Sequence, residues 1–206
     1  MIKVLGRPNS VNVQKVMWCA AELGLDVERA DIGGAFGGTD TDAFRKMNPN
    51  GTIPVLIDGD FTLWESNAIV RYLCAAYGAA PWVLPNAKAH GLADQWMDWY
   101  QTTLHPPMTT LFWQLIRTPA DQVEPAKITA AIDAGAKRWS ILDQHLATSR
   151  FILGDHLSMA DIPLGCAAYR WHSMNFTRPD LPNLRRWWEE LADRPAYKAN
   201  VMLPIT

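Results

Sequence analysis

The sequence has few cysteines, and none of them is placed to build a site. Cys19, Cys74 and Cys166 are widely spaced, with no C-x-x-C pair and no cluster of cysteine with histidine. An odd number of isolated cysteines argues against both a disulfide framework and a metal site. Cys19 and Cys74 lie in apolar stretches with helical character, so we expect reduced thiols buried as small hydrophobic side chains.

Excess charge and long apolar runs are also missing. The 206 residues carry a net charge of -2, with 19% charged and 49% hydrophobic residues. This composition excludes the basic footprint of a nucleic-acid-binding protein and the bias of a disordered chain. No apolar run approaches the ~20 residues of a membrane helix, and the first residues lack the apolar segment of a secretory signal. We expect a globular protein of the cytoplasm, in one or two domains, that binds neither nucleic acid nor membrane.

The first part of the chain alternates between strand and helix patterns. The Asp58-Gly59 pair between two apolar stretches predicts a hairpin, and Gly24 is suited to ending a helix. The order β-α-β-α-β-β-α predicts a small α/β domain over residues 1–79. The predicted elements are strands near 2–6 and 26–32, two strands within 52–64, and helices at 12–24, 42–47 and 65–78.

Strand patterns stop beyond this domain. Residues 80–87 are predicted to form a linker, and residues 88–206 an all-α domain. Apolar residues recur there at helical spacing, with an interruption at Pro106-Pro107, where a helix must kink or restart. In the stretch HLSMADI, Ser158 is expected to cap a further helix with Asp161 at its third position.

Ser10 and Asn12 stand where the first strand gives way to a helix. Both residue types are favoured helix N-caps, so they could simply satisfy free backbone N–H groups. Position 13 is Val and position 15 is Lys, however, so neither residue heads a capping box. The local sequence favours capping and leaves a ligand-binding role open.

Two further stretches have features of a ligand site. Pro54 stands where a strand should begin, which suits an edge position or a cis bond and leaves the backbone of Ile53 free to pair with an extended, peptide-like ligand. The N-terminus of the helix at 65–78 could receive a carboxylate at Ser66, while Glu65 could accept an ammonium group. The alternatives are an ordinary turn and an ordinary helix cap.

In this order and spacing, the three stretches resemble the glutathione S-transferase superfamily over essentially the whole chain. NPNGTIPVL is similar to the family's Pro loop, ESNAI to its Glu-Ser motif, and HLSMADI to the capping box of its C-terminal domain. LPNLRRWWEELADRPAY is typical of its bacterial cytosolic members. The resemblance implies a thioredoxin-like first domain that binds glutathione, an all-helical second domain, and a homodimer.

The resemblance also implies roles for the glutathione-binding residues. Pro54 would be cis, and the backbone of Ile53 would pair with the cysteinyl part of glutathione. Glu65 and Ser66 would bind its γ-glutamyl end. A hydrophobic second substrate is expected between the domains, and we predict that Trp96, Tyr100 and Leu104 belong to its pocket, although most aromatic residues on that helix should be core.

Ser10 falls where the Ser- and Thr-type members of the family place the hydroxyl that activates the thiol. Asn12 matches the asparagine that some bacterial and fungal members use alongside it or instead of it. A thiol with a pKa near 8.5 is mostly protonated at neutral pH. Hydrogen bonds from these two side chains and the positive end of the helix favour the thiolate, and lowering the pKa by ~2 units requires about 3 kcal/mol of interaction.

The resemblance implies a transferase that activates glutathione, its cosubstrate, for attack on a hydrophobic electrophile, without a metal. Two alternatives remain. The same site could serve a glutathione-dependent disulfide reductase or peroxidase, and the chain could be a non-catalytic glutathione-binding or regulatory module. No feature of the sequence identifies the electrophile or separates detoxification from a catabolic or redox role.

Overall fold

The computed structural model describes all 206 residues, which form two compact units. The first unit comprises Met1–Val83 and Pro195–Leu203, and the second comprises Leu84–Arg194 and Pro204–Thr206. The boundary between Val83 and Leu84 lies within the predicted linker. Residues Pro195–Leu203, which the sequence analysis placed in the helical domain, belong instead to the first unit.

The first unit is built on a four-stranded sheet with the strand order β2-β1-β3-β4. β1 pairs in parallel with β2 and antiparallel with β3, and β3 pairs antiparallel with β4. This arrangement confirms the predicted β-α-β-α-β-β-α order. The elements are β1 (Ile2–Leu5), α1 (Val11–Glu22), β2 (Val27–Ala30), α2 (Asp42–Met47), β3 (Val55–Asp58), β4 (Phe61–Trp64), α3 (Ser66–Tyr77) and α9 (Pro195–Asn200).

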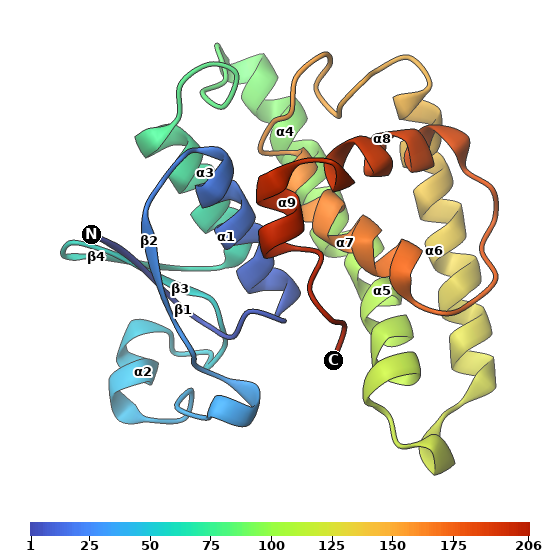
Figure 1. Ribbon diagram of the computed structural model, residues 1–206, viewed down its shortest axis with the longest axis horizontal. Helices are drawn as coiled ribbons and strands as arrows, with labels where there is room; N and C mark the ends of the chain where they lie inside the picture. The colour runs from blue at the N-terminus through green and yellow to red at the C-terminus, as the bar shows by residue number, and fades with distance from the viewer. The chain divides into compact units, whose positions relative to one another are not determined.

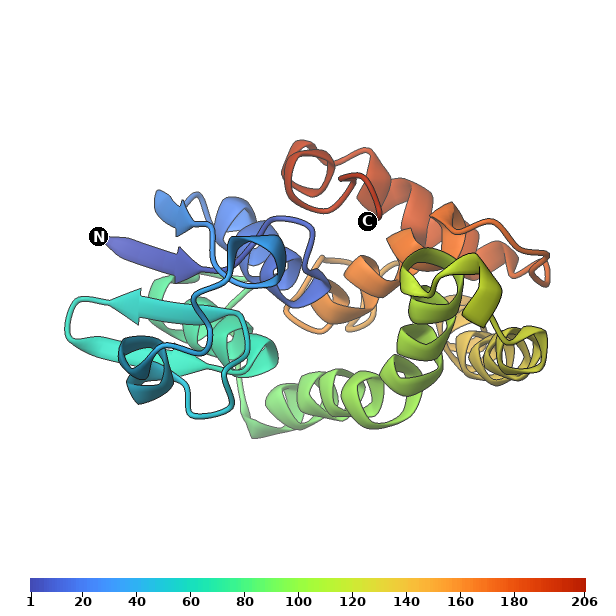
Figure 2. The ribbon, with the colours of Figure 1, turned by 90° about the horizontal axis from the view of Figure 1, so that it is seen from below.

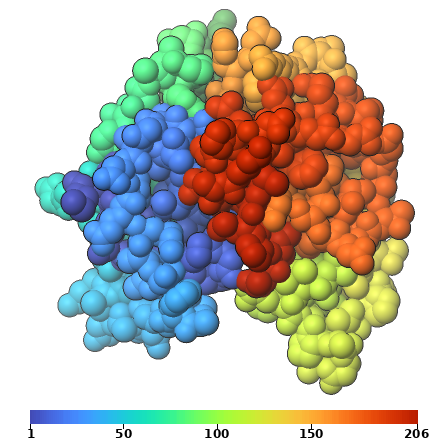
Figure 3. Space-filling model, viewed as in Figure 1, coloured from blue at the N-terminus to red at the C-terminus, as the bar shows by residue number.

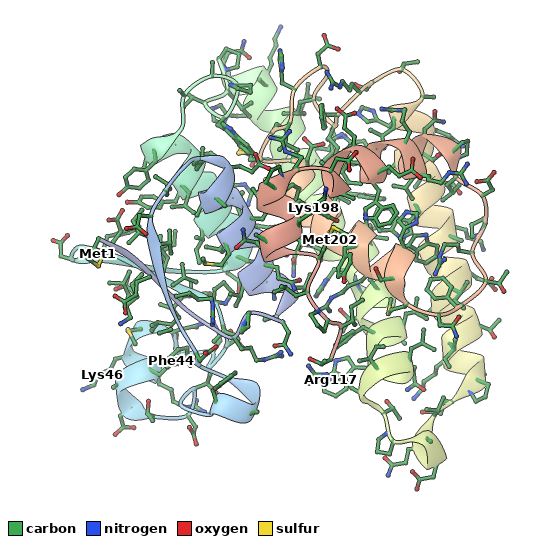
Figure 4. The ribbon with its side chains drawn as sticks, viewed as in Figure 1. Met1, Phe44, Lys46, Arg117, Lys198 and Met202 are labelled. Atoms are coloured by element: carbon green, nitrogen blue, oxygen red, sulfur yellow. The ribbon has the colours of Figure 1, made fainter.

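Helices cover both faces of this sheet. Leu5 of β1 and Val55 of β3 pack with Phe44 of α2. Because side chains alternate along a strand, Val4 and Leu56 point to the opposite face, where α1 and α3 lie side by side (Figure 1). Figure 4 shows Phe44 on the short helix α2, beneath the strands. The two central strands, β1 and β3, are therefore covered on both sides.

The C-terminal helix α9 completes the first unit. Trp18 of α1 and Tyr197 of α9 are both fully buried, and their rings meet edge to face with centroids 4.8 Å apart. Figure 3 shows part of the red C-terminal segment directly against the blue N-terminal segment. The ring of Tyr197 thus covers part of the large indole and fixes α9 to α1.

The second unit contains five α-helices with two π-helical turns. α4 and α5 form one bent rod, because the π-helical turn Tyr100–Leu104 joins them (Figure 2). Pro106 and Pro107 lie in the first turn of α5, where a missing N–H costs little. Of the kink or restart predicted at the two prolines, the structure shows the kink: the helix bends but does not break. The helices are α4 (Ala87–Trp99), α5 (His105–Phe112), α6 (Pro125–Leu146), α7 (Asp161–Ser173) and α8 (Pro182–Ala192).

A buried carboxylate organises the start of α7. Asp161 accepts hydrogen bonds from the backbone N–H of Ile152, the backbone N–H and hydroxyl of Ser158, and the indole N–H of Trp187, at 2.9 to 3.0 Å. Burial raises the pKa of Asp161, and these hydrogen bonds oppose the rise. The predicted Ser158–Asp161 pairing is confirmed, but α7 begins at Asp161 rather than just after Ser158, because the carboxylate bonds three separate segments.

Candidate functional site

The loop between β1 and α1 lies close to α1 and to the segment that precedes β3. A Cβ added to Gly6 would lie 2.4 Å from Cγ2 of Val13 and 3.4 Å from Cβ of Ile53. Glycine therefore lets the end of β1 pass beside α1 and beside the segment that precedes β3. These contacts bring two of the three predicted stretches together.

Ser10 occupies the N-cap position of α1 without capping it through its side chain. Its carbonyl accepts the N–H of Gln14 at 2.9 Å, but its hydroxyl makes no cap hydrogen bond. The residue is half-buried. The structure thus separates the two roles that the sequence left open: the backbone of Ser10 starts the helix, and the hydroxyl remains available to a ligand.

Asn12 and Ser66 connect the first loop to the start of α3. The hydroxyl of Ser66 donates to Oδ1 of Asn12 at 3.3 Å, between residues 54 positions apart in the sequence. Ser66 is the first residue of α3 and is buried. The predicted thiol end and the predicted carboxylate end of the site therefore share a direct hydrogen bond.

Lys15 is the residue of this region that the sequence analysis missed. Its side chain is 0% exposed, and its Nζ lies 3.3 Å from Oγ of Ser66 and 3.5 Å from Oδ1 of Asn67. Lys15 follows Asn12 by three positions on α1, and that spacing places two side chains on one face of a helix. A lysine within the largely apolar sequence VQKVMWCAA was the signal, but the sequence did not show that α3 would bury it.

Glu65 has an unusual backbone at the start of α3. Its φ of 71° makes it the one non-glycine residue with positive φ. Such a conformation costs on the order of 1–3 kcal/mol and persists only where the surroundings impose it. Its side chain is exposed and does not cap α3, so the carboxylate stands beside the positive end of the helix.

The segment before β3 matches the expected geometry. The Ile53–Pro54 peptide bond is cis, as the resemblance implied. Ile53 precedes β3, is half-buried, and makes no backbone hydrogen bond to another part of the chain. Its N–H and C=O are therefore available to pair with an extended ligand.

The aromatic residues predicted for the second substrate lie inside the helical unit. Trp96, Tyr100 and Leu104 are all buried, and they do not line the cavity beside Trp171 and Arg178 or the one beside Trp113 and Ala131. The hydroxyl of Tyr100 is hydrogen-bonded to Nδ1 of His105 at 3.0 Å, and burial raises the pKa of Tyr100. The packing agrees with the core role expected for most of this stripe, and a contact with substrate stays a prediction.

The cysteines, the potential metal ligands and the helices were considered as parts of a second site, and none forms one. None of the three cysteines forms a disulfide, and all are buried, as predicted for Cys19 and Cys74. The Sγ atoms of Cys19 and Cys74 are 3.7 Å apart. No three His, Cys, Asp or Glu side chains come together as metal ligands. No helix is both long enough and apolar enough to cross a membrane. The polar cluster in the first unit is therefore the candidate site.

Comparisons with known proteins find relatives of both parts of the chain. Residues 1–75 match the family model "Glutathione S-transferase, N-terminal domain", and residues 125–190 match "Glutathione S-transferase, C-terminal domain". Glutathione S-transferase GstB of Escherichia coli K12 is 37% identical, with all of both chains covered. The chain belongs to the glutathione S-transferase family. Glutathione S-transferase 3 of Zea mays is 30% identical, covering 97% of this chain and 93% of that protein.

Two solved structures are similar in fold to the whole chain. The theta class glutathione S-transferase from Xanthomonas axonopodis pv. citri with glutathione bound has a TM-score of 0.96 at 43% identity, covering 100% of this chain and 99% of that one. Its apo form has a TM-score of 0.87, covering 100% and 98% of the two chains. The α/β-plus-helical fold predicted for a glutathione S-transferase is thereby confirmed.

Proposed function

We propose that the protein is a glutathione transferase whose first unit activates the thiol of glutathione for attack on a hydrophobic electrophile. The observation that carries the proposal is the hydrogen bond from Ser66 to Asn12. This bond joins the candidate carboxylate site at the N-terminus of α3 to the candidate thiol site at the N-terminus of α1. One small peptide with a thiol in its middle and a carboxylate at its γ-glutamyl end fits both.

Each part of the site has a distinct task in this proposal. The N-terminal N–H groups of α3, that of Ser66 included, receive the γ-glutamyl carboxylate, and Glu65 receives the ammonium group beside it. The free backbone groups of Ile53 pair with the cysteinyl residue. These contacts place the sulfur by the start of α1, next to Ser10 and Asn12.

Thiol activation follows from the donors gathered there. The unused hydroxyl of Ser10, the amide of Asn12 and the positive end of α1 all stabilise a negative sulfur more than a neutral one. Their combined effect lowers the pKa of the bound thiol and raises the fraction of thiolate, which is the nucleophile. The thiolate then forms a bond to the electrophilic carbon and displaces the leaving group.

The family relationship supports this assignment. The related Xanthomonas structure is described with glutathione bound, and GstB is named as a glutathione S-transferase. A homodimer and a cytoplasmic location are further parts of the proposal. Sedimentation measurements would test the first, and cell fractionation the second.

The test is the ultraviolet absorbance of the thiolate of bound glutathione as a function of pH. We expect the wild type to hold the pKa of the thiol well below that of free glutathione, and Ser10→Ala and Asn12→Ala each to lose part of that difference. Asn9→Ala, which alters the same loop one residue before Ser10, is the matched control. Conjugation of chloronitrobenzene should fall in parallel with the thiolate fraction.

Two results would redirect the proposal. A wild type that binds glutathione without lowering the pKa of its thiol would be a binding module, not a transferase. Efficient reduction of a glutathione mixed disulfide or a peroxide, without conjugation, would assign the alternative redox activity to the same site. If only one of the two alanine variants loses the pKa shift, that residue is the dominant donor.

A further inference from the structure

Lys15 places its amino group behind the candidate site, where it donates to Ser66 and Asn67. Its side chain is fully buried on α1, and Nζ lies within 3.3 Å of Ser66 and 3.5 Å of Asn67. A buried ammonium is costly to maintain unless its surroundings return that cost through hydrogen bonds and charge. Two of its partners are the first two residues of α3, the proposed receptor of a carboxylate.

The chemistry of lysine fixes the direction of the adjoining hydrogen bonds. An ammonium group donates three hydrogen bonds and accepts none. The oxygen of Ser66 therefore accepts from Lys15, and its single hydrogen must point to another acceptor. In the structure that acceptor is Oδ1 of Asn12.

The hydrogen bond from Ser66 also fixes the orientation of the Asn12 amide. With Oδ1 of Asn12 held by the hydroxyl of Ser66, the N–H groups of that amide are directed to the other side. An amide that faces a sulfur with its N–H stabilises the thiolate, whereas one that faces it with its oxygen destabilises it. Lys15, Ser66 and Asn12 thus form a hydrogen-bonded chain with one polarity.

We propose that Lys15 is a positioning residue for thiol activation. It sets the polarity of the Lys15–Ser66–Asn12 chain, so that Asn12 presents an N–H donor to the sulfur of glutathione, and it adds positive charge beneath the carboxylate end of the site. The proposal rests on the proposed function above, since it concerns the same bound glutathione. Lys15 itself stays behind Ser66 and does not touch the reacting atoms.

The experiment replaces Lys15 by an uncharged side chain that still fills most of its volume. Lys15→Met gives an unbranched side chain one atom shorter and removes the charge, and replacing a buried charge by an apolar group of similar volume is often tolerated. We expect the pKa of the bound thiol to rise by ~0.5–1 unit, and the Kd for glutathione to rise roughly ten-fold. Both are measured on protein whose thermal unfolding shows it to be folded.

Gln14→Met is the matched control. Gln14 is the preceding residue of α1, is also buried, and its Oε1 makes no hydrogen bond. Its replacement should leave the pKa of the bound thiol unchanged. Should Lys15→Met fail to fold, Lys15→Gln serves the same test, because it retains a neutral donor while the charge is lost.

A double-mutant cycle separates positioning from simple structural support. In a Ser66→Ala background the chain is already broken, so Lys15→Met should shift the pKa of the bound thiol by less than half of its effect in the wild type. A structural role would reduce the amount of folded protein and leave the pKa within the folded fraction unchanged. Equal shifts in both backgrounds, or no difference between Lys15→Met and Gln14→Met, would overturn the proposal.

The cycle also distinguishes the two levels of inference. If the wild type does not lower the pKa of the bound thiol, the proposed function is wrong and the role of Lys15 falls with it. If the wild type lowers the pKa and Lys15→Met lowers it equally, the transferase assignment stands and only the role of Lys15 is rejected.

Discussion

Buried polar groups serve different ends in the two units. In the helical unit, Asp161 is surrounded by backbone, hydroxyl and indole donors, and Asp143 accepts the backbone N–H groups of Asn183 and Leu184, each at 2.8 Å. In the first unit, Ser10 makes no cap bond, and the bond between Ser66 and Asn12 is long, at 3.3 Å. The first arrangement is saturated by the protein itself, and the second retains capacity for a ligand.

Whether the protein itself saturates the hydrogen bonds of a polar group therefore indicates whether that group serves stability or ligand binding, whatever its residue type. A saturated buried group should contribute to the free energy of unfolding and little to binding. A group with unused donors should do the reverse, because its best partner is absent until the ligand arrives. The following substitutions test the contrast, beginning with the largest expected effect.

Asp161→Ala should lower the free energy of unfolding by about 3–5 kcal/mol, because it leaves several buried donors without a partner. Urea denaturation followed by fluorescence measures this loss. Asp155→Ala, an exposed carboxylate on the same segment, is the control and should change stability little. The affinity of the remaining folded protein for glutathione should be preserved, and a large loss of affinity would contradict the contrast.

His172 tests an incompletely saturated group of the helical unit. Its Nε2 is buried without a hydrogen bond, and burial with nearby Arg178 and Arg185 lowers the pKa of His172 to about 4. The unfolded state binds the proton more readily, so the stability that His172 contributes is complete above about pH 6.5 and is lost as the pH falls toward 4. After allowance for partial exposure, we expect a loss of about 1 kcal/mol between pH 7 and pH 5.

The matched variant for this prediction is His172→Phe, which retains a ring to stack on Trp188 but does not titrate. Its urea midpoint should fall less than that of the wild type between pH 7 and pH 5. His90→Phe, at an exposed position of α4, should follow the wild type. Identical pH profiles for all three proteins would show that His172 does not titrate as described.

The smallest difference concerns two N-cap residues of the first unit. The Thr41 hydroxyl accepts the N–H of Phe44 at 3.2 Å and caps α2, whereas the Ser10 hydroxyl caps nothing. Thr41→Ala should therefore cost about 0.5–1 kcal/mol of unfolding free energy, and Ser10→Ala clearly less. Thermal unfolding compares them directly, and an equal loss would restore the capping role of Ser10.

Local rules predicted much of this molecule from its sequence. The hairpin at Asp58-Gly59, the kink of the helix near Pro106-Pro107 and the Ser158–Asp161 pairing all depend on residues close in the chain, and all are confirmed. The fold class followed from the order of elements together with the family resemblance.

Features that depend on distant contacts were not predicted. Lys15 is distinguished by its burial against α3, and a single sequence does not show which face of α1 meets that helix. The association of α9 with the first unit depends on the contact between Trp18 and Tyr197, and the short sequence PAYKAN has no pattern that identifies its partner. The role of the Ser10 hydroxyl could be judged only from the structure, because serine is suited both to a helix cap and to a ligand site.

The placement of α9 has a consequence for how the protein is made. Trp18 emerges early from the ribosome, whereas the Tyr197 ring that covers it is among the last residues to be synthesised. The first unit therefore stays unfinished, with an exposed indole, until the whole helical unit has been translated. A fragment that ends at the linker would lack this cover, so we expect the first unit to be less stable when it is cut from the chain.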